Sequence, residues 1–330
     1  MKVLFIRFSS LGDVLLTTPI IRTFRTHFPD AEIHFLTKKQ FVPLLEYNPN
    51  IDDLIGYAAE NESMLQLIIR LQKAHYTHII DLHDKLRSAL IKRFVQGKVF
   101  TYHKKHIYRK KLLKDRNLIP ISSTVDLYAS VLENFNLRLE DRKLDLFLPE
   151  NEQAIAESFL QKTKKKIITI SPGASWFTKQ YPIEYYKKII RHFLDNYDVR
   201  IILIGTEQEK NLTAELASVS EYETLNLGGR TTLIESAVII KHSNLFISGD
   251  CGPMHIAAAF EVPQIALFGP THPKLGFAPL NPNAEVLTLN LDCSPCSLHG
   301  NNSCPKSHFK CMKDLSPNLV LERADKILSH

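Results

Sequence analysis

Short apolar runs alternate along this chain with longer amphipathic segments. The runs have the length of strands buried on both faces, and the longer segments repeat their apolar residues with the period of a helix. Repeated units of this kind predict parallel sheets covered by helices on both faces. The predicted strands are residues 3–6, 32–36, 53–57, 78–82, 99–102, 167–171, 199–204, 224–227, 245–248 and 263–268.

Amphipathic segments between these strands predict helices, the first of them bent at Pro19. They are residues 12–28, 41–46, 62–74, 86–95, 125–135, 150–160, 185–196, 207–218, 233–242, 254–260 and 318–329. Because 330 residues are too many for one ordinary core, we expect two Rossmann-like, doubly wound α/β domains. They are residues 1–155 and 156–316, with helix 317–330 folded back onto the first. Ligands bind beyond the carboxyl ends of the strands in such sheets, so the site is expected in a cleft that the two domains face.

The composition is that of a globular protein, with 44% hydrophobic and 23% charged residues and no apolar run long enough to span a bilayer. The N-terminus lacks the apolar stretch of a signal peptide. We therefore expect a cytoplasmic protein whose five cysteines are reduced thiols or metal ligands. The net charge of +6 is concentrated in a basic segment, residues 102–117. This segment is either a solvated face or a contact for an acidic partner, such as nucleic acid, a phosphorylated glycolipid or an anionic membrane.

The stretch LFISGDCGPMHIAAAFEVPQIALFGPT, residues 245–271, reads as strand, tight turn, helix and strand. Pro253 suits the first position of the helix, where its missing N–H costs nothing. A helix that begins at a glycine-containing turn presents free N–H groups and a positive dipole end, which together bind anions such as phosphate. The alternative is an ordinary βαβ unit with Asp250 as the helix cap.

Three further loops follow predicted strands. RFSSLGD, residues 7–13, lacks the spacing of a dinucleotide-binding fingerprint, which argues against a nicotinamide enzyme. Its Asp13 is either a general base or a charge at a helix N-terminus. SPGASWFTKQYP, residues 171–182, offers Lys179 beside a turn of small residues. GTEQE, residues 205–209, offers a glutamate that could accept hydrogen bonds from ribose hydroxyls.

Taken together and in order, RFSSLGDVLLTTP, PGASW with its following lysine, LNLGGRTTLIE and SGDCGPMHIAAAFEVPQIALFGPT resemble glycosyltransferase family 9. The best-known members of that family are the ADP-heptose:lipopolysaccharide heptosyltransferases. The resemblance extends over nearly the whole chain. It implies the GT-B fold, in which the first domain binds the acceptor and the second binds the nucleotide sugar.

The resemblance also implies roles for individual residues. Asp13 matches the proposed general base, and Lys179 matches the lysine that steadies the donor phosphates. Donor-binding positions are Gly12, Ser175, Glu209, Asp250, Gly252, Met254 and His255, with the choice between Glu207 and Glu209 left open. Candidate contacts for an anionic inner-core glycolipid are Ser10, Arg87, Lys104 and Arg109.

The implied reaction is an inverting transfer from an ADP-sugar that requires no metal and no further cofactor. The enzyme is expected to be a monomer at the cytoplasmic face of the inner membrane, without a nucleic-acid partner. Two alternatives stay open. One is a GT-B enzyme with another donor, a UDP-sugar transferase or epimerase, and the other is a non-catalytic protein that binds a nucleotide or glycolipid.

Four cysteines near the C-terminus, Cys293, Cys296, Cys304 and Cys311, have a spacing that could bind zinc. His299 and His308 lie among them in the sequence. A structural metal, a disulfide or redox role, and reduced thiols in a loop are all compatible with this pattern.

Overall fold

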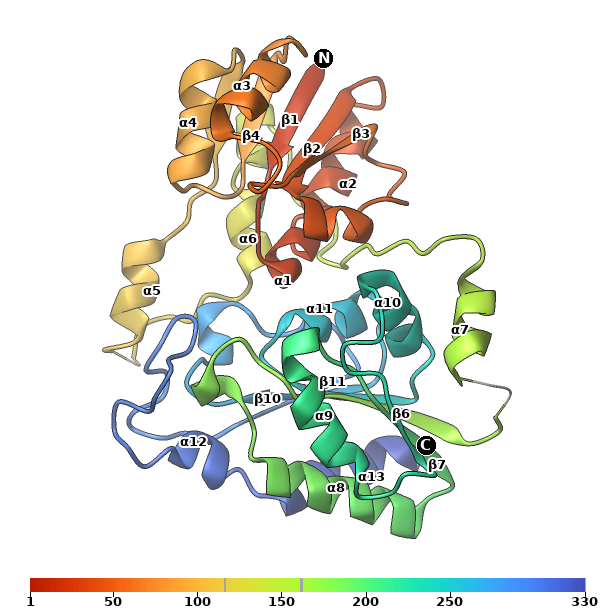
Figure 1. Cartoon of the computed structure of the whole chain (residues 1–330). Helices are drawn as coiled ribbons and strands as arrows, with labels where there is room; N and C mark the ends of the chain where they lie inside the picture. Colours follow the sequence, from red (N-terminus) through yellow and green to blue (C-terminus); the bar gives the residue numbers. More distant parts are fainter. Residues whose placement is uncertain (116, 161–162, 330) are drawn as a thin grey trace. The chain divides into compact units, whose positions relative to one another are not determined.

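The computed structural model describes residues 1–115, 117–160 and 163–329 (Figure 1). The chain divides into two compact units. The first comprises Met1–Lys105 and Ser123–Phe147, and the second comprises His106–Ser122 and Leu148–His330. Arg116 of the basic segment, Gln161, Lys162 and His330 of the expected C-terminal helix lie outside the described residues.

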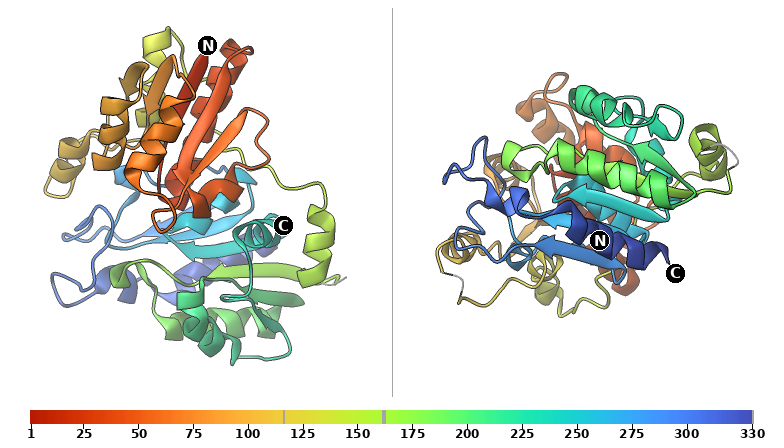
Figure 2. Two further views of the ribbon diagram at one scale, coloured as in Figure 1. Left: turned by 45° about the horizontal axis from the view of Figure 1, so that its top comes forward. Right: turned by 90° about the horizontal axis from the view of Figure 1, so that it is seen from below.

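The first unit contains a five-stranded parallel sheet in the order β3-β2-β1-β4-β5 (Figures 1 and 2). Its strands are β1 (Lys2–Ile6), β2 (Glu32–Lys38), β3 (Asp53–Tyr57), β4 (His78–Asp81) and β5 (Lys98–Thr101). The chain runs outward from β1 to β3 and then returns to β4 on the other side of β1. The direction of winding therefore reverses between β1 and β4, and ligands bind at the carboxyl ends of strands beside such a reversal.

The helical segments of the first unit are α1 (Leu11–Leu15), α2 (Thr18–His27), η1 (Lys39–Leu44), α3 (Met64–Gln72), α4 (Leu86–Phe94), α6 (Thr124–Ala129) and η2 (Leu132–Phe135). The single bent helix expected over residues 12–28 is two helices. Pro19 lies in the first turn of α2, where a residue without an N–H is tolerated. The helix expected over residues 125–135 is likewise divided, into α6 and the 3₁₀ turn η2.

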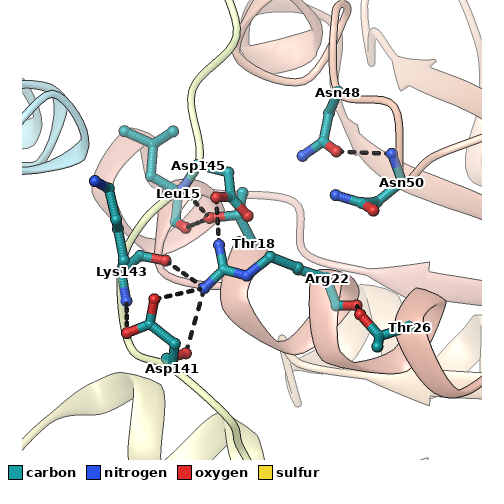
Figure 3. Close-up of polar contacts among 9 residues, drawn as sticks. All are labelled: Leu15, Thr18, Arg22, Thr26, Asn48, Asn50, Asp141, Lys143 and Asp145. Carbon is teal, nitrogen blue, oxygen red and sulfur yellow. Dashed lines mark hydrogen bonds and ion pairs between the residues drawn. The ribbon is translucent and has the colours of Figure 1, made fainter.

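The last residues of the first unit are tied back to α2 (Figure 3). Arg22 forms an ion pair with Asp145 and donates from Nη2 to the Lys143 carbonyl oxygen at 3.0 Å. Thr18 Oγ1 accepts the Asp145 N–H at 2.9 Å. Burial raises the pKa of Asp145, and the Arg22 charge opposes that effect. These bonds explain why the chain remains part of the first unit as far as Phe147.

The second unit contains a six-stranded parallel sheet in the order β11-β10-β9-β6-β7-β8 (Figure 2). Its strands are β6 (Lys166–Ser171), β7 (Val199–Leu203), β8 (Thr224–Asn226), β9 (Leu245–Gly249), β10 (Gln264–Phe268) and β11 (Ala284–Thr288), the last of which was not predicted. Here the winding reverses between β6 and β9. The loops after these two strands, which contain Lys179 and Asp250, therefore begin at neighbouring strand ends.

The helical segments of the second unit are α5 (His106–Leu112), α7 (Glu152–Leu160), η3 (Phe177–Lys179), α8 (Ile183–Asn196), η4 (Glu207–Glu209), α9 (Lys210–Ala217), α10 (Leu233–Lys241), α11 (Gly252–Ala259), η5 (Pro273–Leu275), α12 (Lys310–Lys313) and α13 (Pro317–Leu328).

Two segments belong to a different unit from the one expected. The C-terminal helix α13 was expected on the first domain, but its buried Val320, Ala324 and Leu328 belong to the core of the second unit. The basic segment was expected in the first domain, but α5 belongs to the second unit, in which the Ile121 N–H donates to the Lys274 carbonyl oxygen at 2.9 Å. The boundary also falls at Phe147 rather than at residue 155.

Among the helices in the described part of the chain, none combines the length and the apolar character required to cross a bilayer.

Candidate active site

Asp13 lies in α1, immediately after the central strand β1 of the first unit. Ser10 caps this helix, and its N–H and hydroxyl both donate to Asp13 Oδ2, at 3.1 and 2.8 Å. Tyr128 of α6 donates its hydroxyl to Oδ1 at 3.1 Å. The carboxylate is thus oriented from two sides, while 18% of the side chain remains accessible.

Arg7, at the end of β1, forms an ion pair with the same carboxylate. Its Nη2 lies 2.8 Å from Asp13 Oδ2, and its Nη1 donates to the Leu82 carbonyl oxygen at 2.6 Å. Burial alone would raise the pKa of Asp13, but the Arg7 charge and the hydrogen bonds from Ser10 and Tyr128 outweigh it and lower the pKa to about 2. Asp13 is therefore a carboxylate throughout the neutral range.

Sequence reasoning identified Asp13 but missed Arg7, Tyr128 and His83, which surround it in the first unit. The sequence did contain a signal for Arg7, because this residue directly follows a predicted buried strand, where the site residues of such sheets lie. Tyr128 is distant in sequence and gave no signal. His83 is 5% exposed and packs edge-on against Phe8, with ring centroids 5.4 Å apart. Burial and the nearby positive charge of Arg7 lower the pKa of His83 to about 3, so its ring is neutral at pH 7.

A second group of charges follows β4. Asp81 is fully buried; its Oδ1 accepts the N–H groups of His83 and Asp84, and its Oδ2 pairs with Lys92 at 2.8 Å. Lys104 joins this group, because its Nζ donates to the Asp84 carbonyl oxygen at 2.6 Å. Burial lowers the pKa of Lys104. This candidate acceptor contact therefore lies in the first unit, where it was expected.

The other two basic candidates have different surroundings. Arg87 is exposed in the first turn of α4, with its guanidinium 5.8 Å from the centre of the Tyr57 ring. Arg109 belongs to the second unit and is 8% exposed. It lies over the Phe277 ring at 4.5 Å and donates to the Leu275 carbonyl oxygen at 3.2 Å. Arg109 thus attaches α5 to the second unit, a structural use that the charge pattern did not indicate.

The first unit also holds a pocket of about 600 Å³ beside its edge strand β3. Lys39, Asn61 and Arg70 provide polar groups in its lining. Gly56 lets β3 pack closely against η1, because a Cβ there would lie 3.0 Å from Val42 Cγ2. The pocket is assembled from η1, β3 and α3, so no single sequence motif indicated it.

In the second unit, Lys179 and Asp250 come together from the loops after β6 and β9. Lys179 Nζ lies 2.9 Å from Asp250 Oδ2, and the two side chains are 14% and 11% exposed. Thr271 donates its hydroxyl to the same oxygen at 2.6 Å. The sequence predicted both charged residues as donor contacts, and the structure joins them as a pair.

Helix α11 begins directly after this pair, with Cys251 as its cap and Pro253 in its first turn. Met254 is fully buried against Ala266 and Phe268, so its side chain serves the core; only its backbone remains a candidate donor contact. His255 is also buried, at 4% exposure. Burial raises the pKa of Cys251 to about 11, which keeps this thiol neutral.

The two glutamates of the GTEQE loop have different surroundings. Thr206 donates its N–H and hydroxyl to Glu209 Oε2 at 2.8 and 3.0 Å, and a Cβ on Gly173 would lie only 1.8 Å from Glu209 Oε1. Glu209 therefore lies against the turn that precedes Ser175 and Lys179. The side chain of Glu207 is 66% exposed and lies beside Gly229 instead. Ser175 itself is exposed on that turn.

The loop that contains the cysteines is hydrogen-bonded to the turn that contains Lys179. Thr178 donates its N–H to the Asn301 carbonyl oxygen at 3.1 Å, and Thr178 Oγ1 accepts the Asn301 N–H at 2.8 Å. Gly300 has a φ of +102°, and a Cβ there would lie 2.6 Å from the Trp176 Cβ. Glycine is therefore required where this loop crosses the turn.

The cysteines themselves are free thiols. Cys293 Sγ lies 3.7 Å from His308 Nε2, and Cys311 is buried, which raises its thiol pKa to about 12. Within the described residues, no group of three or more His, Cys, Asp or Glu side chains is placed to hold a metal ion. The geometry therefore gives no ligand set for the zinc alternative.

Two parallel α/β units, each with polar loops at its winding reversal, have the architecture of the GT-B fold. The fold matches an Escherichia coli ADP-heptose lipopolysaccharide heptosyltransferase II with a TM-score of 0.79 and 22% identity, over 99% of this chain and 98% of that one. It matches a glycosyltransferase family 9 protein from Veillonella parvula with a TM-score of 0.82 and 22% identity, over 99% and 97%.

Sequence comparison defines the family. The model of glycosyltransferase family 9 (heptosyltransferase) matches residues 64–306. A lipooligosaccharide heptosyltransferase 2 from Campylobacter jejuni is 30% identical over 327 residues, which cover 97% of this chain and 96% of that protein. This chain belongs to glycosyltransferase family 9, and it is a glycosyltransferase.

Proposed function

We propose that this enzyme transfers heptose from ADP-heptose to the inner core of lipopolysaccharide, with inversion at the anomeric carbon. The observation that carries the proposal is the oriented, ionised carboxylate of Asp13, held by Arg7, Ser10 and Tyr128 at the end of the central strand. The names of the related proteins, a lipooligosaccharide heptosyltransferase and an ADP-heptose heptosyltransferase, support this donor and acceptor.

In the proposed reaction, an acceptor hydroxyl oxygen attacks the anomeric carbon and its proton passes to Asp13. The bond from the anomeric carbon to the diphosphate oxygen breaks, and the electron pair leaves with ADP. A carboxylate with a pKa of about 2 is a weak base. It therefore accepts the proton late, when bond formation has made the hydroxyl acidic.

The second unit supplies all the proposed donor contacts except Gly12, which lies in α1 of the first unit. Lys179 neutralises charge on the departing diphosphate, together with the N-terminus of α11 at Gly252. Asp250 accepts hydrogen bonds from sugar hydroxyls, which requires its 2.9 Å pair with Lys179 to open or to be shared. Glu209 accepts from the ribose, because its side chain lies against Gly173 in the Lys179 turn. With these groups present, we propose that no divalent metal is needed.

The first unit supplies the proposed acceptor contacts. Arg87 and Lys104 offer positive charge to phosphates or carboxylates of an anionic glycolipid. The pocket lined by Lys39, Asn61 and Arg70 is large enough to hold a sugar. Because such an acceptor is embedded in a bilayer, we propose that the enzyme works at the cytoplasmic surface of a membrane. We also propose that it works as a monomer.

One experiment tests the whole proposal. The purified protein is incubated with ADP-heptose and a heptose-deficient lipopolysaccharide, in the presence of EDTA, and the product is analysed by mass spectrometry. A product heavier by one heptose residue supports the donor, the acceptor and the metal independence together. Thermal stabilisation by UDP but not by ADP would instead favour the UDP-sugar alternative.

A further inference from the structure

Helices α3 and α4 of the first unit expose large apolar side chains. Along α4, Leu86, Leu90 and Phe94 repeat at every fourth position and are 78%, 36% and 54% exposed. Along α3, Leu65 and Ile69 are 67% and 44% exposed. The inward faces of these helices already bury other residues in the core, so the exposed set is a second apolar surface.

The two helices that carry these side chains are neighbours in the first unit. They lie side by side on one face of the sheet, as Figures 1 and 2 show. Gln72 Nε2 at the end of α3 donates to the Phe94 carbonyl oxygen of α4 at 2.9 Å. We call this surface the α3–α4 face and define it by Leu65, Ile69, Leu86, Leu90 and Phe94.

The charges on these helices have one sign. Met64–Gln72 and Leu86–Phe94 contain no aspartate or glutamate. They contain Arg70, Arg87, Lys92 and Arg93, of which Arg70 pairs with Glu62 at 3.0 Å and Lys92 with Asp81 at 2.8 Å. The cations that border the apolar side chains are therefore Arg87 and Arg93, together with Lys73, Lys85 and Lys98 beside the helices. An apolar surface bordered by cations fits the boundary between the acyl chains and the anionic headgroups of a membrane.

We propose that the α3–α4 face is the surface through which this enzyme docks on an anionic lipid bilayer. A second copy of the chain fits this face poorly, because contact between two such faces would place cation against cation. Nucleic acid also fits this face poorly, because the apolar centre of the face would then have no partner. Arg70 of α3 also lines the pocket beside β3, so a bilayer on this face lies near the proposed acceptor pocket.

This inference rests on the membrane location proposed above, but not on the donor or on the roles of Asp13 and Lys179. The test is sedimentation of the full chain with vesicles of phosphatidylcholine alone, or with about one third phosphatidylglycerol. We expect binding to the anionic vesicles that weakens as salt is added. Equal binding to both kinds of vesicle would overturn the proposal.

Two double variants separate the contributions. Leu86→Gln with Phe94→Gln removes two apolar side chains and is expected to lower partitioning roughly tenfold or more. Lys73→Gln with Arg93→Gln is expected to lower it by about fivefold for each charge removed. The controls lie on the second unit: Tyr222→Gln, at a side chain that is 96% exposed, and Lys164→Gln with Arg191→Gln, both exposed.

Transfer to a short, water-soluble acceptor should be unchanged in all these variants, which separates a failure of docking from a failure of the proposed reaction. Wild-type partitioning of the Leu86/Phe94 variant would overturn the proposal. So would a wild-type dimer that the same variant dissociates, measured by light scattering, because the face would then serve a second copy.

Discussion

At the scale of single residues, the proposed chemistry depends most on Asp13. Asp13→Asn keeps the shape of the side chain but removes the base, and it is expected to lower kcat by about 10²- to 10⁴-fold. ADP affinity should not change, because the proposed nucleotide contacts other than Gly12 lie in the second unit, and Asp13→Asn leaves the Gly12 backbone in place. Steady-state kinetics and calorimetry measure the two effects. Asp195→Asn, at an exposed position of α8, is the matched control, and full activity of Asp13→Asn would exclude Asp13 as the base.

Arg7 sets the protonation of Asp13, and this has a consequence for the pH profile. In the wild type the pKa of Asp13 is about 2, so no acid limb from this group appears near neutral pH. Arg7→Met removes a positive charge while burial remains, so the pKa of Asp13 rises from about 2. Activity should then fall as pH is lowered through the raised pKa. Profiles of kcat/KM measure the shift, and Arg7→Lys should restore most of the wild-type profile.

The lowered pKa of His83 leads to a prediction about how the stability of the protein depends on pH. The pKa of this residue is lowered to about 3 in the folded protein, against about 6.5 when unfolded. The unfolded state therefore binds more protons between these values, and the free energy of unfolding falls as pH drops below about 6.5. His83→Gln should flatten this dependence, measured by urea unfolding at pH 7 and at pH 5. His75→Gln, on the exposed turn after α3, is the control and should leave the slope unchanged.

At the scale of elements, the turn that carries Lys179 depends on a loop more than a hundred residues away. Thr178 is 1% exposed, and its hydroxyl bonds both the N–H and the carbonyl oxygen of Asn301. Thr178→Val keeps the volume but leaves the Asn301 N–H without this acceptor, at a cost of about 1–3 kcal/mol in the free energy of unfolding. A misplaced Lys179 should also weaken ADP binding several-fold.

Thermal unfolding and calorimetry with ADP measure the two effects of Thr178→Val. Thr178→Ser keeps the hydroxyl and should retain wild-type ADP affinity even where the lost methyl group lowers stability. If Thr178→Val binds ADP as the wild type does, the loop has no part in positioning Lys179.

Elements also show what the sequence could and could not predict. Strand positions followed from apolar runs, because a strand buried on both faces has few polar residues. The sequence did not show to which unit each helix belongs. The amphipathic α13 would suit either unit, and the basic residues of α5 gave no sign that Arg109 lies over Phe277. Asp13 and Lys179 were recognised because motifs surround them, whereas Tyr128 depends on tertiary contact alone.

At the scale of the whole molecule, each unit has its own hydrophobic core, one around β1 and β4 and one around β6 and β9. A ligand that binds one unit can therefore change the local stability of that unit alone. ADP should slow amide hydrogen exchange in residues 171–179, 205–209 and 249–255, all in the second unit. Residues 7–13 of the first unit should exchange nearly as before, because Gly12 is the single proposed donor contact among them. Exchange measured by mass spectrometry with ADP, and with UDP as the control nucleotide, tests this division. Protection that UDP produces as strongly as ADP, or that appears first in residues 7–13, would contradict the assignment of the nucleotide to the second unit.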